Sequence, residues 1–261
     1  MDNPNRTPLL DQIRRGDAPP DVRHVAALGE LEARASDQLA LWAILLDDPD
    51  LEIRAAAATT IAKVAPLALS AALARPEVSD DTRGRFLVLG VGAGPTPSES
   101  DDPFVELTPA STQESAEPTG AGDADAKVDL GSLTVPQKLK VAMRGTREQR
   151  GTLIRDPNKL VSAAVLSSPK LTESEVESFA RMANVAEDVL RIIAMNRAWT
   201  RNYAVASALV KNPKTPLALS LPMLPRLNER DVKALAVDRN VPEAIRIAAR
   251  KFVSAGAGRR S

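Results

Sequence analysis

Cysteine does not occur in this chain of 261 residues, and histidine occurs once. Without cysteine the protein has no disulfide, no thiolate metal ligand and no cysteine nucleophile. The one histidine, His24, has no second histidine for a metal site and no partners for a catalytic triad. We therefore assign His24 to a helix surface or a packing contact, and we expect neither a metal nor another cofactor.

Aromatic residues are also scarce, at 3% of the chain, although 44% of its residues are hydrophobic. A core of Ala, Leu, Val and Ile suits thin layers of close-packed helices better than sheets, whose strands favour aromatic and β-branched residues. No apolar run approaches the roughly 18 residues of a spanning helix, and the first residues lack a signal-peptide pattern. We expect a cytoplasmic protein without a membrane segment, and the frequent Ala, Arg and Pro are compatible with a bacterial source.

The net charge is zero, but the charges are unevenly distributed. Residues 1–92 carry 10 Lys and Arg against 14 Asp and Glu (−4), residues 93–134 carry 1 against 9 (−8), and residues 135–261 carry 23 against 11 (+12). An acidic segment joined to a basic one indicates an anionic partner or masking within the chain.

Residues 93–132 combine five prolines with many Ser, Thr and Gly residues and few apolar ones. Such a composition buries too little apolar surface to offset the entropy of ordering, so it predicts a disordered acidic linker. The linker separates two expected domains, residues 1–92 and residues 133–261. Its apolar cluster, Phe104-Val105-Glu106-Leu107, is either a chance grouping or a short docking motif that folds on a partner.

The C-terminal domain contains an internal repeat. A constant shift of 56 residues places 153–193 on 209–249, so that Pro157 aligns with Pro213 and Phe179 with Leu235. A gapless register that keeps prolines and apolar positions together is typical of a repeat array, in which short helices stack on one another. The shift predicts that Phe179 and Leu235 are both core residues.

Cap residues place several of these helices. Thr172-Glu173-Ser174-Glu175 predicts a capping box, and Asn228-Glu229-Arg230-Asp231 is its copy. In the N-terminal domain, Asp48-Pro49-Asp50 precedes an apolar-Arg-x-x-Ala-Ala pattern that includes Arg54.

That Asp-Pro turn followed by an Arg- and Ala-containing helix resembles the second helix of a HEAT repeat. About two thirds of the chain is similar to an α-solenoid of the HEAT or leucine-rich-repeat-variant type. The resemblance implies an all-α fold of short stacked helices in two segments. One member of the variant family binds an iron–sulfur cluster through cysteines, a feature that this cysteine-free chain cannot share.

Rare aromatic residues alternate with basic ones in one segment of the C-terminal domain. Trp199 and Tyr203 are four residues apart, which predicts one helical face. The candidate binding residues are Arg197, Trp199, Arg201, Tyr203, Lys211 and Lys214. Either the two rings fill the core between repeats, or the segment binds a protein or an anion such as a nucleic acid.

We expect a non-enzymatic scaffold that binds an unidentified protein partner, since no nucleophile–base pair is discernible. The alternative is nucleic-acid or polyanion binding through the basic C-terminal domain.

Overall fold

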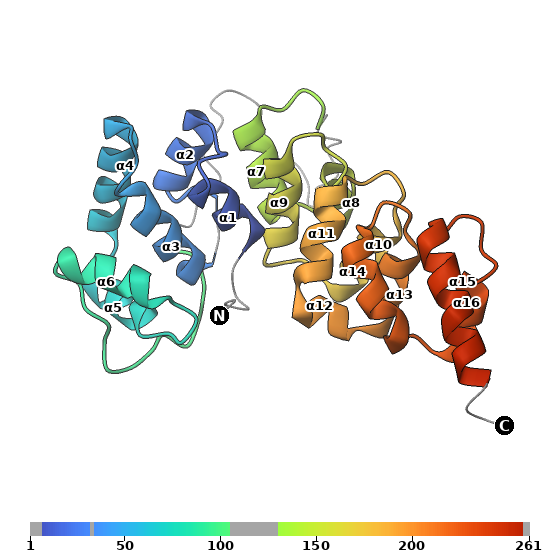
Figure 1. The fold of residues 1–261 in the computed structure, drawn as a ribbon. Helices are drawn as coiled ribbons and strands as arrows, with labels where there is room; N and C mark the ends of the chain where they lie inside the picture. Colours follow the sequence, from blue (N-terminus) through green and yellow to red (C-terminus); the bar gives the residue numbers. More distant parts are fainter. Residues whose placement is uncertain (1–6, 32–33, 105–129, 258–261) are drawn as a thin grey trace, which may run out of the picture. The chain divides into compact units, whose positions relative to one another are not determined.

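The structure is a computed structural model that describes residues 7–31, 34–104 and 130–257. Every regular element in these residues is a helix, which confirms the all-α fold class. The chain divides into two units (Figure 1). We call Leu9–Gly145 the N-terminal unit, and Thr146–Ser261, which is grouped with Met1–Pro8, the C-terminal unit.

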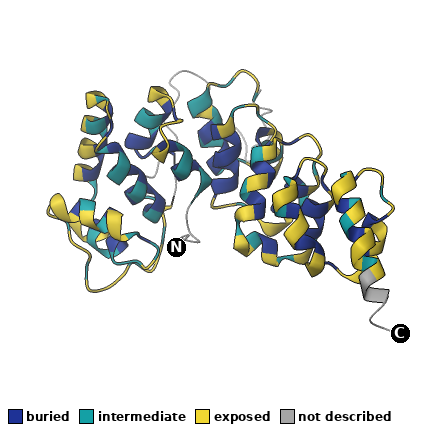
Figure 2. Cartoon of the chain, in the orientation of Figure 1, coloured by how far each residue is buried: buried dark blue, intermediate teal, exposed yellow. Residues whose placement is uncertain are grey.

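The N-terminal unit contains seven described helices around one core. Its largest fully buried side chains include Trp42, Leu39 and Phe86, and Figure 2 shows buried residues along the inner sides of these helices. The helices are α1 (Pro8–Arg14), α2 (Pro20–Ala27), α3 (Ala35–Leu45), α4 (Leu51–Lys63), α5 (Pro66–Leu73), α6 (Asp80–Val88) and α7 (Val135–Arg144).

The Asp-Pro turn lies directly before α4. The Asp50 side chain caps α4 by accepting a hydrogen bond from the Glu52 amide, at 2.9 Å. The buried Asp48 carboxylate accepts from Arg23 at 2.7 and 2.8 Å, while Arg54 donates to the Asp48 carbonyl at 2.9 Å. The turn therefore ties α2 to the start of α4.

Helix α7 belongs to the N-terminal unit, although we expected residues 133–261 to form the C-terminal domain. It packs on α2, it buries Leu139 and Met143, and the Lys140 ammonium lies 2.5 Å from the Glu30 carboxylate. The apolar face of α7 packs within the N-terminal unit, and the boundary between the two units therefore lies at Gly145/Thr146. Residues 146–261 then carry 20 Lys and Arg against 11 Asp and Glu, a charge of +9.

The beginning of the expected linker is bonded to the N-terminal unit. We call Gly94–Phe104 the strap; its residues contact α3 and α5 through several hydrogen bonds, such as Ser98 N to Ala71 O at 2.9 Å. The prediction of a linker disordered from residue 93 therefore differs from the structure over these residues. Composition missed the contact because its partners lie far away in the sequence. Residues 105–129, with most of the predicted linker, lie outside the described residues.

The C-terminal unit consists of short helices joined by capped turns. Predicted caps at Thr172 and Asn228 are both present, accepting from the amides of Glu175 and Asp231. The helices are α8 (Arg147–Leu153), α9 (Lys159–Ser167), α10 (Glu173–Arg181), α11 (Glu187–Met195), α12 (Arg197–Arg201), α13 (Tyr203–Lys211), α14 (Leu217–Ser220), the 3-10 helix η1 (Leu221–Arg226), α15 (Glu229–Leu235) and α16 (Glu243–Ala257).

The 56-residue shift relates the starts of three helix pairs: α8 and α13, α10 and α15, and α11 and α16. The shift also relates α9 to the short α14 with η1, where Pro222 and Pro225 remove backbone donors and tighten the helix. Phe179 and Leu235 are 2% and 1% exposed, which confirms that both are core residues.

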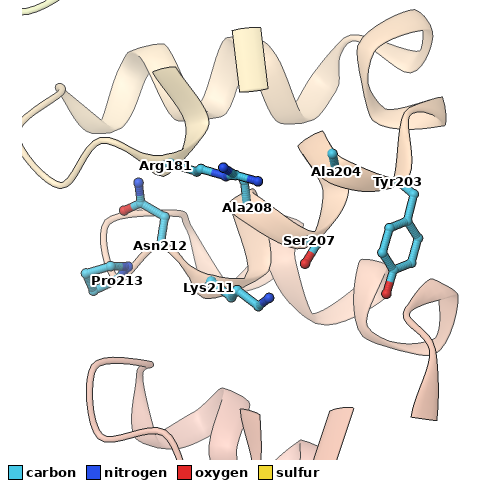
Figure 3. Close-up of a pocket in the computed structure, with 8 residues that line it drawn as sticks. All are labelled: Arg181, Tyr203, Ala204, Ser207, Ala208, Lys211, Asn212 and Pro213. Carbon is cyan, nitrogen blue, oxygen red and sulfur yellow. The ribbon is translucent and has the colours of Figure 1, made fainter. Parts of the chain in front are cut away.

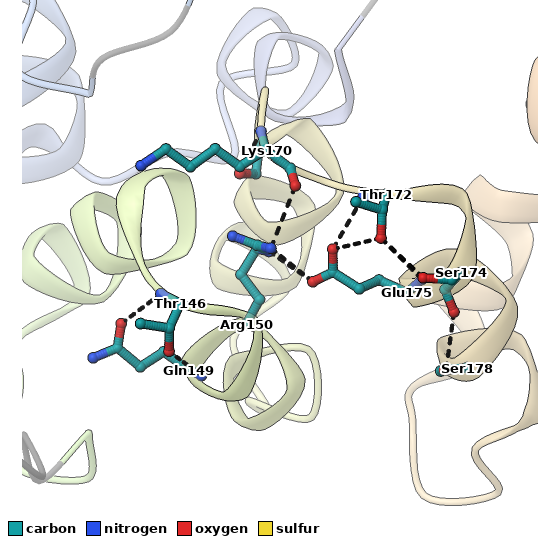
Figure 4. A network of polar contacts seen from close by, with 9 residues as sticks. Thr146, Gln149, Arg150, Lys170, Thr172, Ser174, Glu175 and Ser178 are labelled. Carbon is teal, nitrogen blue, oxygen red and sulfur yellow. Dashed lines mark hydrogen bonds and ion pairs between the residues drawn. The ribbon is translucent and has the colours of Figure 1, made fainter. Parts of the chain in front are cut away.

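A buried ion pair joins α8 to α10 (Figure 4). The Arg150 and Glu175 side chains are 5% and 2% exposed, and Arg150 donates to Glu175 Oε1 at 2.8 and 3.0 Å. The other Glu175 oxygen accepts from the backbone and hydroxyl of Thr172, which completes the predicted capping box.

The environment of Glu175 acts on its pKa in both directions. Burial raises the pKa of its carboxyl, but the bonds from Thr172 and Arg150 outweigh burial and hold that pKa below its ordinary value.

Among the described helices, none alone is long and apolar enough to cross a membrane. Helices α4 and α5 meet the length and composition only when taken together, with a bend of 100° between them.

Candidate functional site

The Arg- and aromatic-containing segment is divided between two helices. Asn202 ends α12 and begins α13: its backbone is extended (φ −68°, ψ 122°), and its side chain accepts from the Ala204 amide at 2.9 Å. The expectation that Trp199 and Tyr203 share one helical face is therefore wrong. A four-residue spacing places side chains together only when the helix is continuous, and Asn202, a favoured N-cap residue, interrupts it.

The other predicted binding residues lie around this break. Arg197, Arg201 and Lys214 are exposed, and Trp199 is half-buried. The Lys214 ammonium donates to the Val185 carbonyl at 3.2 Å. Only Tyr203 and Lys211 of the six predicted residues line a common groove.

Tyr203 connects α13 to α15. Its hydroxyl donates to the Asp231 carboxylate and accepts from the Asn228 amide at 3.2 Å, and the Lys211 ammonium lies 3.5 Å from the other Asp231 oxygen. The residue remains 42% exposed, so Tyr203 is not a core residue.

These contacts change two pKa values in opposite directions. The hydrogen bond to Asp231 is the main cause of a raised pKa at the Tyr203 phenol. The same bond is the main cause of a lowered pKa at Asp231, assisted by Lys211 and opposed by burial. At neutral pH the Tyr203 phenol is therefore neutral and the Asp231 side chain is a carboxylate.

An open groove of about 380 Å³ runs along α13 and reaches α10 (Figure 3). Tyr203 lies at one end, and Figure 3 shows Arg181 of α10 across from the Lys211 side chain. The middle of the groove is lined by small residues. Its lining residues are Arg181, Tyr203, Ala204, Ser207, Ala208, Lys211, Asn212 and Pro213.

Asn212 holds the far end of the groove together. Its buried amide donates to the carbonyls of Ala180 and Met182, at 2.8 and 2.9 Å, and its side-chain oxygen accepts from the Lys214 amide at 3.0 Å. The bonds to Ala180 and Met182 satisfy both amide hydrogens, so Asn212 has a structural role in joining α13 to the end of α10.

A second groove of about 510 Å³ lies along α8 in the first copy of the repeat. Four of its lining residues occupy the positions of four residues of the α13 groove under the 56-residue shift. These residues are Arg147, Glu148, Gly151 and Arg155, and their equivalents are Tyr203, Ala204, Ser207 and Lys211. The repeat therefore places a groove at the same helix face twice, with different side chains.

The α13 groove offers two cations and one aromatic ring to a ligand. Sequence reasoning named Tyr203 and Lys211 but missed Arg181 and Asp231, which approach from α10 and α15. The repeat contained a signal for Asp231, because it aligns with the capping Glu175. Within the described residues, no group of three or more His, Asp or Glu side chains is placed to hold a metal ion.

Comparison with known proteins gives no relative. No family model matches the chain, and no curated protein and no solved structure is significantly similar to it.

Proposed function

We propose that the protein is a non-enzymatic, cytoplasmic protein-interaction scaffold, an α-solenoid of HEAT-like repeats whose C-terminal unit binds a segment of a partner protein along α13. The observation that carries the proposal is an open groove lined by the exposed Tyr203 at one end and by the cations of Arg181 and Lys211. Tyrosine and arginine are among the residue types enriched where protein interfaces concentrate their binding energy.

The groove favours an acidic partner segment. Arg181 and Lys211 have side chains that are 68% and 45% exposed, and each also contacts one carboxylate of this chain, Glu177 or Asp231. A partner carboxylate can replace either contact at little cost, because exposed ion pairs contribute about 0–1 kcal/mol.

The test is affinity purification of the full chain from its native host, comparing the wild type with a Tyr203→Ala/Lys211→Ala variant. Arg191→Ala is the matched control, because Arg191 is an exposed α11 residue with its own (i, i+4) pair to Glu187. Loss of a partner from the groove variant alone supports the proposal. Equal recovery by all three chains contradicts it.

Polyanion binding remains the second candidate, supported by the +9 charge of residues 146–261. Several of these cations, however, already contact carboxylates, as in Lys159–Asp188 and Lys233–Glu229, each at 2.8 Å. This pairing favours the scaffold. Heparin affinity at two salt concentrations tests the alternative, because phosphate-type contacts weaken steeply with salt.

A further inference from the structure

The strap binds to the N-terminal unit as an extended peptide would (Figure 1 shows it as part of the green connection after α6). The amide of Gly94, its first residue, donates to the Ser70 carbonyl at 2.8 Å, and the Ser98 amide donates to the Ala71 carbonyl at 2.9 Å. Arg75 Nη1 donates to the Ser98 carbonyl at 2.8 Å. The end of α5 and the residues after it therefore hold the first half of the strap through backbone groups, which any extended segment possesses.

The second half of the strap places a carboxylate at the start of α3. Asp101 Oδ1 accepts from the Ser36 amide at 3.0 Å, Oδ2 accepts from the Ser36 hydroxyl at 2.9 Å, and the Asp101 carbonyl accepts from the Ala35 amide at 3.1 Å. Arg34, the N-cap residue of α3, makes no side-chain cap bond. A carboxylate at this position is favoured by the unpaired amides and by the helix dipole, and Arg75 Nε lies 3.7 Å from it.

An aromatic ring follows the carboxylate by three residues. The Phe104 ring stacks on Trp42 with a centroid distance of 5.7 Å and an interplanar angle of 27°. The Phe104 amide donates to Gln38 Oε1 at 2.8 Å, and Gln38 is itself oriented by a bond to the Gly29 carbonyl. Trp42 and Gln38 are buried, so the surface that receives the ring is rigidly held by the core of the unit.

The strap covers this surface without entering the core. None of the residues from Gly94 to Phe104 is buried, whereas the receiving Trp42 is fully buried beneath them. Pro103 also favours an extended backbone at Asp102, and hydrogen bonds that join Ser100 to Ser98 and to Asp102 hold the segment in its own shape. The strap therefore resembles a ligand bound to a surface more than it resembles an element of the core.

We propose that the α3–α5 surface under the strap is a binding site for an extended segment of a partner protein that has a carboxylate three residues before an aromatic ring. The strap is the intramolecular ligand that occupies the site until such a segment displaces it. This site gives the scaffold a second binding surface. It rests on the proposed function only in requiring that a partner protein exists. Its test does not involve Tyr203 or Lys211, so either proposal can fail without the other.

The experiment is a titration of the full chain with a fluorescent peptide that copies residues 94–104. In the wild type the tethered strap competes at an effective concentration in the millimolar range. An Asp101→Ala/Phe104→Ala chain has a weakened strap, and we expect it to bind the peptide at least tenfold more tightly. Glu99→Ala is the matched control: it removes another exposed carboxylate of the strap, and we expect an affinity within twofold of the wild type.

The chemistry of the peptide is tested in the same assay. Peptides with Asp101→Ala or Phe104→Ala should lose at least tenfold in affinity for the weakened-strap chain, and a peptide with Glu99→Ala should not. Equal binding of all peptides, or equal binding by all chains, overturns the proposal.

A measurement on the wild type covers the case in which the double variant does not fold. With the peptide in excess, the Phe104 amide of the strap should exchange its hydrogen faster, while the Ala35 and Ser36 amides stay protected by the incoming carboxylate. Unchanged exchange at Phe104 overturns the proposal. A peptide-sensitive dimer of the wild type would identify the strap of a second copy as the occupant and would overturn it as well.

Discussion

The two copies of the 56-residue repeat place a carboxylate at the same helix position and use it differently. In the first copy Glu175 is buried and pairs with Arg150 of α8. In the second copy Asp231 takes the equivalent position, Ala206 replaces Arg150, and the carboxylate instead contacts Tyr203 and Lys211 at the surface. In the copy that lacks the buried cation, the carboxylate's partners thus lie at the surface, where they line a groove.

Arg150→Ala should produce the largest difference in stability between a variant of the first copy and the corresponding variant of the second copy. It leaves the Glu175 carboxylate buried without its guanidinium, which costs about 3–5 kcal/mol of stability. Lys211→Ala, the change in the second copy, removes an exposed pair worth about 0–1 kcal/mol. Urea unfolding of both variants measures the difference, and equal losses would show that the two carboxylates have equivalent roles.

Phe179→Ala and Leu235→Ala test what the copies share. Both residues are buried at equivalent positions, so each truncation should lower the free energy of unfolding by about 2–5 kcal/mol. The same urea experiment measures both. If one truncation left stability unchanged, the structural equivalence of α10 and α15 would be lost.

Acid should lower the stability of the folded protein mainly by protonating Glu175 in the first copy of the repeat. The pKa of Glu175 is lowered in the folded state, so its contribution to stability is present above the unfolded pKa of about 4.3 and is lost as pH falls through the folded value. We expect the wild type to lose stability more steeply below about pH 4.3 than a Glu175→Gln variant does. Asp231→Asn should flatten the curve less, and the reverse order would contradict the assignment of Glu175 as the buried member.

The smallest expected effect is spectroscopic and belongs to the second copy. Tyr203 is the only tyrosine of the chain, so its ultraviolet absorbance reports its ionisation directly. The contact with Asp231 raises its pKa, and Asp231→Asn should therefore lower the titration midpoint towards 10, the ordinary value for tyrosine. Lys233→Ala, which removes an exposed pair on the same helix, serves as the control and should leave the midpoint unchanged.

Local patterns in the sequence predicted much of this structure. The caps at Thr172 and Asn228 and the core positions Phe179 and Leu235 depend on neighbours within a few residues or on the repeat, and all four are confirmed. Most of the residues that form the α13 groove could not be predicted in this way. Arg181 reaches the groove from another helix. The break at Asn202 forms because its side chain caps α13, whereas the sequence is also compatible with one continuous helix.

Long-range contacts account for the remaining differences. The apolar face of α7 gave no indication that it packs on α2, and the composition of the strap gave none that Asp101 binds the start of α3. In both cases the partner lies far away in the sequence, where periodicity and composition carry no information.

The bond between Ser36 and Asp101 also has a consequence for the order of synthesis. The two residues are 65 positions apart, so at a synthesis rate of about 5–20 residues per second the start of α3 emerges roughly 3–13 s before its cap. During that interval the first turn of α3 depends on water for its amide partners. A fragment that stops at residue 92, the expected domain boundary, would remain in that state permanently, so an expressed N-terminal unit needs to extend through Phe104 and to include α7.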